Sequence, residues 1–194
     1  VGGGATYDEA CQPLIVVANG MRLGILAFAA TDPWVGALQA TSGRGGVAPL
    51  VEASATAAIA DMAPTVDAVI VCVHWGKEYM PLPPPEIVRL GRSLIDAGAR
   101  VVLGTHPHVM QPLETYQGGV ICYSLGNLLF PAYPEQGLDF SGDGLLSMVV
   151  AIEIGTETAF VKGTTVVSFD EAGFLSCVPA PAAQALLDDL TAKA

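Results

Sequence analysis

The sequence predicts a single domain of the α/β class, and three observations lead to that prediction. Hydrophobic residues make up 52% of the 194 residues and charged residues only 14%, so the chain can bury a substantial core. Short apolar runs at 68–73 and 100–103 are typical of strands buried on both faces. A helical pattern at 86–97 separates them, and this strand–helix–strand order favours a parallel crossover. We therefore expect one layered α/β or α+β domain over residues 1–194.

The other elements follow from turn and helix signals along the chain. Asn19-Gly20 separates two β-rich runs and predicts a hairpin, because a type I′ turn needs positive φ at both central residues. Gly98 stands where a glycine commonly ends a helix. We further expect strands at 120–124, 145–154, 160–169 and 174–178, helices at 6–11, 49–62 and 181–192, and a loop at 31–46.

Charge and hydropathy exclude several classes of partner. The chain has 8 Lys and Arg against 19 Asp and Glu, a net charge of −11. We expect no nucleic-acid partner, because phosphate binding needs clustered basic side chains. The longest apolar stretch, 14–30, is interrupted by Asn19, Gly20 and Arg22, so no membrane span is expected. The chain begins at Val1 with no signal-peptide pattern, and we expect any signal or anchor to lie outside these residues.

All three histidines of the chain are predicted to meet at one edge of the sheet. His74 follows the first buried strand, and His106 and His108 follow the second. Parallel neighbours bring their carboxyl ends to the same edge. In an extended H-x-H segment both imidazoles point to the same side, and Pro107 favours extended backbone at His106. Such a set suits Zn, Mn, Fe or another divalent metal; ordinary structural or surface histidines are the alternative.

Residues near the histidines offer further parts of a site, each with a plainer interpretation. Glu78 and Glu114 are the local carboxylates, and their spacing is compatible with metal ligands or with solvated side chains. Trp75 could stack on a substrate or pack the loop. The turn at 123–127 could be structural, since Gly126 permits a tight bend.

Four motifs of the chain resemble those of CapA-type capsule synthesis proteins, the PGA_cap family. Their order and spacing also resemble the family pattern, and they cover about residues 13–130. The family is similar to calcineurin-like metallophosphoesterases, so the resemblance implies a four-layer αββα sandwich with a dinuclear metal centre. The motifs are His74-Trp75-Gly76-Lys77-Glu78-Tyr79, Leu94-Ile95-Asp96-Ala97-Gly98-Ala99, Gly104-Thr105-His106-Pro107-His108-Val109 and Tyr123-Ser124-Leu125-Gly126-Asn127.

The resemblance implies roles for individual residues. Divalent metal ions would be the cofactors, and carboxylate or amide side chains would accept a proton or orient an imidazole. We expect metal ligands at His74, His106 and His108, catalytic roles for Glu78 and Asn127, and substrate contacts from Trp75, Tyr79 and Ser124.

The function implied is poly-γ-glutamate or capsule biosynthesis through metal-dependent hydrolysis of a phosphoester or amide bond. Substrates would be an acidic polymer or a phosphoester, partners would be membrane proteins of capsule synthesis, and the full-length protein would be extracytoplasmic and membrane-associated. The family's upstream G-D, N-x-E and N-N-H segments do not occur here. We therefore expect this chain to be the C-terminal part of the domain, with further ligands from an N-terminal half. The alternative is a non-catalytic module that binds a polymer or partner in an envelope-polymer synthesis complex.

Overall fold

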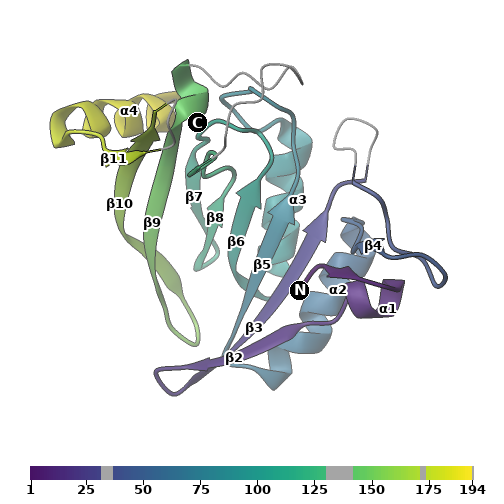
Figure 1. The fold of residues 1–194 in the computed structure, drawn as a ribbon. Helices are drawn as coiled ribbons and strands as arrows, with labels where there is room; N and C mark the ends of the chain where they lie inside the picture. The colour runs from purple at the N-terminus through teal and green to yellow at the C-terminus, as the bar shows by residue number, and fades with distance from the viewer. Residues whose placement is uncertain (32–36, 130–141, 171–173, 194) are drawn as a thin grey trace.

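The computed structural model describes residues 1–31, 37–129, 142–170 and 174–193, which form two stacked sheets, a small two-stranded sheet and helices (Figure 1). The larger sheet has the strand order β2-β3-β5-β6-β8-β7, and the smaller has the order β11-β10-β9. The strands are β1 (Gly3–Gly4), β2 (Leu14–Ala18), β3 (Met21–Ala29), β4 (Gly46–Val47), β5 (Ala68–His74), β6 (Ala99–Thr105), β7 (Leu113–Tyr116), β8 (Gly119–Cys122), β9 (Leu146–Ile154), β10 (Ala159–Phe169) and β11 (Leu175–Cys177). The helices are α1 (Tyr7–Ala10), α2 (Glu52–Met62), α3 (Pro85–Asp96) and α4 (Ala180–Lys193), with 3-10 turns η1 (Ala63–Thr65) and η3 (Gly142–Leu145).

The centre of the larger sheet is parallel, as the sequence predicts. Strands β3, β5, β6 and β8 run parallel, and β2 and β7 add antiparallel edges. The β2–β3 hairpin is confirmed, since Asn19 and Gly20 have φ of 51° and 81°. The β5–α3–β6 crossover is also confirmed, and Gly98 follows α3 with φ of 115°. Strand β7 was not predicted; only four residues long, it shows no clear alternation of apolar and polar residues.

Helices α2 and α3 cover one face of the larger sheet. The alternate residues Val69, Val71 and Val73 of β5 point into this core, where they pack with Ile59 of α2 and Leu94 of α3. Each of these five side chains is buried. Burial of apolar side chains is the dominant favourable contribution to folding. In Figure 1 these helices lie behind the sheet, and the opposite face is turned toward the viewer.

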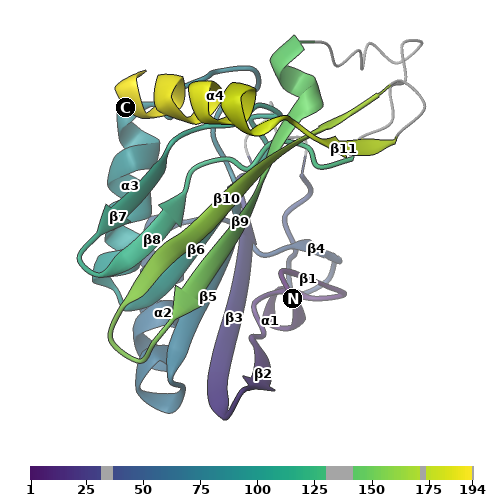
Figure 2. The same cartoon turned by 90° about the vertical axis from the view of Figure 1, so that its left-hand side faces the viewer.

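The smaller sheet covers only part of that opposite face. Val101 of β6 and Val120 of β8 pack against Ala159 of β10, which joins the two sheets (Figure 2). Leucines of α4 pack beside them, on Met148 and Val166. The α/β layering is thus confirmed. No helix among the described elements covers the far side of β9 and β10, where Val149 and Phe160 are exposed.

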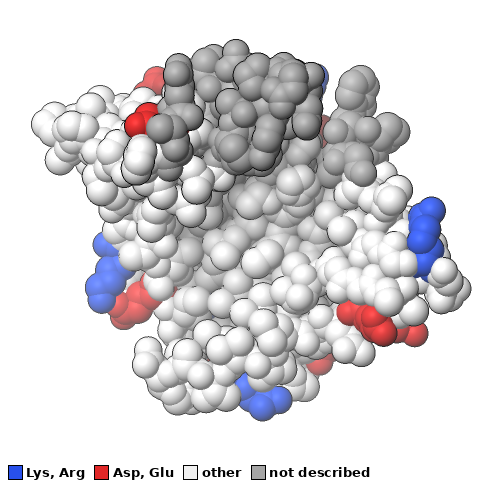
Figure 3. Space-filling model, in the orientation of Figure 1, with Lys and Arg blue, Asp and Glu red and all other residues white. Residues whose placement is uncertain are grey.

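The part of the larger sheet beyond the smaller one is open. A cavity of about 380 Å³ lies on this face beside β3 and β5, and its wall is largely apolar. Figure 3 views the molecule from this side and shows Lys, Arg, Asp and Glu gathered at the margins of the face. The lining includes Ala27, Ala29, Cys72, His74, Leu103 and Thr105.

The terminal helix and the β9–β10 antiparallel pair are confirmed, whereas β8 ends at Cys122, two residues earlier than expected. The loop expected at 31–46 contains residues 32–36, which lie outside the described residues. No helix in the described ranges has the length and apolar character needed to span a membrane.

Gly104 permits the closest packing in the larger sheet. A Cβ at this position would overlap the Tyr123 carbonyl oxygen and lie 2.5 Å from Trp75 Nε1. We expect Gly104→Ala to lower the free energy of unfolding by about 1–3 kcal/mol, the usual cost of overpacking a core. Urea denaturation of the purified variant measures the change.

Gly163→Ala is the matched control, because nothing lies within 4 Å of a Cβ at that exposed strand position. Its free energy of unfolding should stay within about 0.5 kcal/mol of wild type. Equal stability of the two variants would contradict the packing argument.

Candidate metal site

The carboxyl ends of β5 and β6 place His74 beside Thr105. The two residues pair in register as the last residues of their strands. His74 Nδ1 lies 3.1 Å from Thr105 Oγ1, and that hydroxyl donates to the Val73 carbonyl oxygen at 3.2 Å. A hydroxyl has one hydrogen to donate, so Nδ1 of His74 must carry the proton of their bond. Nε2 of His74 is therefore left with a free lone pair, the form that can bind a metal.

His106 and His108 project from a tight turn with an unusual backbone. Their φ angles are 100° and 59°, both in the left-handed region, and Pro107 between them is fully buried. The sequence prediction of an extended H-x-H segment is therefore wrong. A proline disfavours such a backbone at the residue before it, so the surrounding contacts must hold His106 in place.

The three imidazoles nevertheless converge, as predicted. The ring centroids of His74 and His106 are 4.7 Å apart, and those of His106 and His108 are 5.8 Å apart. Convergence thus results from the parallel strand ends and the turn rather than from strand alternation.

Glu78 joins two of the histidines in a group that fits a metal ion. One ligand atom from each of Glu78, His106 and His108 lies within 4.8 Å of the others. The carboxylate Oε1 of Glu78 is 4.0 Å from His108 Nε2. Two imidazole nitrogens and one carboxylate are common ligands of Zn and other divalent transition metals. The geometry makes Glu78 a candidate ligand, whereas His74 lies beside this group rather than in it.

Asn127 orients His108. Its Oδ1 lies 2.6 Å from His108 Nδ1, and its Nδ2 donates to the carbonyl oxygens of Gly144 at 2.9 Å and His108 at 3.3 Å. These two donations fix the amide, so Oδ1 accepts a hydrogen bond from Nδ1–H of His108, whose Nε2 lies on the Glu78 side of the ring. Asn127 thus holds the His108 imidazole, and its catalytic role stays a prediction.

Two residues predicted to contact substrate, Trp75 and Ser124, have side chains that lie in the core. Trp75 is fully buried, stacks with Tyr123 at 6.2 Å and donates from Nε1 to the Tyr123 carbonyl oxygen. Ser124 is also fully buried, and its Oγ donates to the Val109 carbonyl oxygen at 2.7 Å. Neither side chain reaches solvent, and each holds a backbone carbonyl of another segment, while the substrate contacts stay a prediction.

Tyr79 remains the predicted substrate contact that reaches the surface. Its side chain is exposed, and its ring centroid is 6.2 Å from that of His108. Its backbone N–H donates to the Pro107 carbonyl oxygen at 2.8 Å, so the loop that carries Glu78 is tied to the histidine turn.

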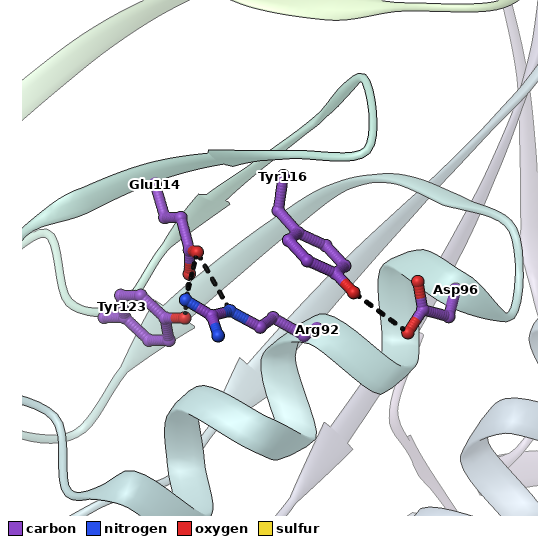
Figure 4. Close-up of polar contacts among 5 residues, drawn as sticks. All are labelled: Arg92, Asp96, Glu114, Tyr116 and Tyr123. Carbon is purple, nitrogen blue, oxygen red and sulfur yellow. Dashed lines mark hydrogen bonds and ion pairs between the residues drawn. The ribbon is translucent and has the colours of Figure 1, made fainter.

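Glu114, the second carboxylate considered from the sequence, belongs to a separate cluster (Figure 4). Both its oxygens are engaged: Oε1 accepts from Arg92, and Oε2 accepts from the Tyr123 hydroxyl. Burial and the adjacent Glu114 raise the pKa of Tyr123, so its hydroxyl stays protonated. The cluster links α3 to β7 and the end of β8, away from the Glu78 group.

Thr105 was missed as a functional residue although it stands inside a recognised motif. Its role depends on the register between two strands, which no single-residue pattern reports.

The pKa of His74 predicts a pH dependence of stability. Burial lowers this pKa below the usual 6.5, the charges of His106 and His108 lower it further, and Glu78 opposes them. The unfolded chain therefore binds a proton at a higher pH than the folded protein. As pH falls from about 6.5 toward the folded pKa, the free energy of unfolding should fall.

Urea denaturation in chelator-treated buffer across pH 5–8 measures this effect. We expect His74→Gln to flatten the dependence. An unchanged slope in that variant would show that His74 is not its source.

Comparison with known proteins identifies the family of the chain. Residues 1–132 match the family described as bacterial capsule synthesis protein PGA_cap. The capsule biosynthesis protein CapA of Bacillus anthracis is 35% identical over 150 residues, which cover 75% of this chain and 35% of that protein. The PGA biosynthesis protein CapA of Bacillus subtilis is 36% identical over 147 residues, covering 75% of this chain and 37% of that protein. The match thus spans about a third of the length of these relatives.

A solved structure supports the fold. A phosphatase from Mycoplasma pneumoniae superposes with a TM-score of 0.50 at 14% identity, covering 87% of this chain and 58% of that chain. This likeness concerns the fold alone, whereas the sequence match covers more than half of the chain. By that match, the chain belongs to the PGA_cap family of bacterial capsule synthesis proteins.

Proposed function

We propose that this chain binds a divalent metal ion through Glu78, His106 and His108 and acts as a hydrolase in the synthesis of an acidic envelope polymer. The observation that carries the proposal is the convergence of these three ligand atoms within 4.8 Å. The contact of Asn127 with His108 adds support, because it holds the imidazole with Nε2 4.0 Å from Oε1 of Glu78. His74 lies beside the group with its own Nε2 free, and it is available as a ligand to a second ion.

A divalent ion supplies Lewis-acid chemistry, which activates water and polarises a phosphoryl or carbonyl oxygen. The residues of the chain would prepare the site for it. Asn127 orients the imidazole of His108 and Thr105 that of His74, each through a hydrogen bond with the ring Nδ1. The exposed ring of Tyr79 offers a surface for the substrate beside His108. Bonds of the phosphoester or amide type are the proposed targets.

The names of the relatives support the choice of substrate class and location. Two of them are described as capsule or PGA biosynthesis proteins. We propose poly-γ-glutamate or a related acidic polymer as the substrate, membrane proteins of capsule synthesis as partners, and a location at the cell envelope. Because the chain carries a net charge of −11, bound metal would be needed to offset repulsion of an anionic polymer.

A further part of a longer polypeptide is proposed to complete the site. The matched region spans about a third of the curated relatives. His74 and Thr105 also line the open cavity beside β3 and β5, so added residues there would lie next to the histidines. Such residues could supply more ligands and cover the apolar face of the sheet.

A non-catalytic binding module is the second candidate function. The burial of Trp75 and Ser124 favours it, because two of the three expected substrate contacts do not reach the surface. In this case the domain would hold a polymer or a partner protein at the same edge of the sheet.

Metal binding is the first test. We expect the purified chain to bind Zn²⁺ or Mn²⁺ in calorimetry. Glu78→Gln should raise the dissociation constant by at least about 10-fold, because a ligand is lost. His108→Ala should raise the dissociation constant further.

Glu153→Gln is the matched control, since Glu153 pairs with Lys162 on the surface of β9 and β10. It should leave the dissociation constant unchanged. No binding by wild type, or equal binding by all variants, would remove the metal site.

Hydrolysis separates the two candidate functions. With metal bound, wild type should release p-nitrophenol from bis(p-nitrophenyl) phosphate, and His106→Ala should reduce the rate to background. Stoichiometric metal binding without any turnover, for the chain and for its longer parent protein, would instead favour the binding module.

A further inference from the structure

We propose that Gln111 is a positioning residue that holds the Glu78 loop against the histidine turn. The proposal rests on the function above, because it assigns Gln111 to the metal site. Gln111 is 1% exposed, which is rare for an uncharged amide of this size. Its Nε2 donates to the Met80 carbonyl oxygen at 2.8 Å, and its backbone N–H donates to the Ser124 carbonyl oxygen at 3.0 Å.

Three hydrogen bonds join the two loops, and they lie on both sides of Glu78. Before Glu78, the Trp75 N–H donates to the Thr105 carbonyl oxygen at 3.1 Å. After it, the Tyr79 N–H donates to the Pro107 carbonyl oxygen at 2.8 Å, and Gln111 holds Met80. The side chain of Gln111 thus closes the far end of the loop, where the other two bonds join backbone groups only.

Glu78 depends on this loop for its place. Its side chain is 47% exposed, so packing does little to hold it. The loop backbone is also irregular, with positive φ at Gly76 and Tyr79. Its carboxylate lies 4.0 Å from His108, and the hydrogen bonds on both sides of Glu78 fix the backbone that carries it. A loop released at Met80 would let the carboxylate move away into solvent.

The buried position of the Gln111 amide requires a physical explanation. Burial of an amide is unfavourable unless hydrogen bonds replace its contacts with water. A purely apolar side chain could fill the same volume but would leave the Met80 carbonyl without this donor. Gln111 therefore supplies a directed tether as well as volume.

The test uses Gln111→Met, which keeps the length of the side chain and removes the donor. Co²⁺ affinity by calorimetry and the Co²⁺ visible absorption spectrum are measured for wild type, Gln111→Met, Glu78→Gln and the double variant. We expect each single variant to bind Co²⁺ about 10-fold more weakly. The double variant should bind within about 2-fold of Glu78→Gln, because both changes remove the same ligand.

Ile59→Val in the core of α2 controls for a general loss of stability. Ile59 is fully buried and packs near Gly98, at the end of the sheet opposite the histidines. It should lower thermal stability without changing Co²⁺ affinity or spectrum. If Gln111→Met does not fold, Gln111→Asn replaces it; the amide is kept, but its donor is drawn back by about 1.5 Å, one C–C bond.

The outcomes are distinct. Affinity losses that multiply in the double variant, or unchanged affinity in both Gln111 variants, would overturn the positioning role while leaving the metal site intact. A wild-type chain that binds no Co²⁺ would overturn the metal site, and the role of Gln111 with it.

Discussion

The structure of the candidate site depends on the parallel pairing of β5 with β6. In this register His74 lies opposite Thr105, so the two loops that carry the other ligands leave the sheet at neighbouring points. A shift by one residue would turn every side chain of a strand to the other face, and His74 would then point toward α2 and α3. Burial of alternate β5 valines against these helices prevents that shift. The core therefore fixes the chemistry at the edge of the sheet.

Around this pairing, most of the polar groups near the site serve to hold others in place. Thr105 and Asn127 each form a hydrogen bond with Nδ1 of one histidine, and Ser124 donates a hydrogen bond to the Val109 carbonyl oxygen next to the histidine turn. Few side chains remain that combine exposure with a place at the site, and Glu78 and Tyr79 are two of them. The candidate site thus combines the exposed Glu78 with the buried His106 and the half-buried His108 on a hydrogen-bonded base.

Much of the fold could be predicted from the sequence, because local patterns determine it. The Asn19-Gly20 turn and the strand–helix–strand unit of β5, α3 and β6 were correctly predicted from such patterns. The convergence of the three histidines was also predicted from the parallel order of two strands, although the turn that brings His106 and His108 together was not.

The roles of individual residues were harder to predict, because they depend on distant contacts. Trp75 and Ser124 have sequence neighbours at the site, yet their side chains turn inward to bond with carbonyl oxygens of other segments. Glu114 of β7 is instead paired with Arg92, which comes from helix α3. Such pairings are set by how the elements pack, and sequence spacing does not record them.

The left-handed backbone at His106 and His108 has a consequence for the rate at which a metal could enter. Each such residue carries a strain on the order of 1–3 kcal/mol, which the folded core already sustains. The turn that carries the two histidines therefore needs little rearrangement on binding. Association would be limited by dehydration of the ion and by its diffusion to the edge of the sheet, rather than by closure of the loops.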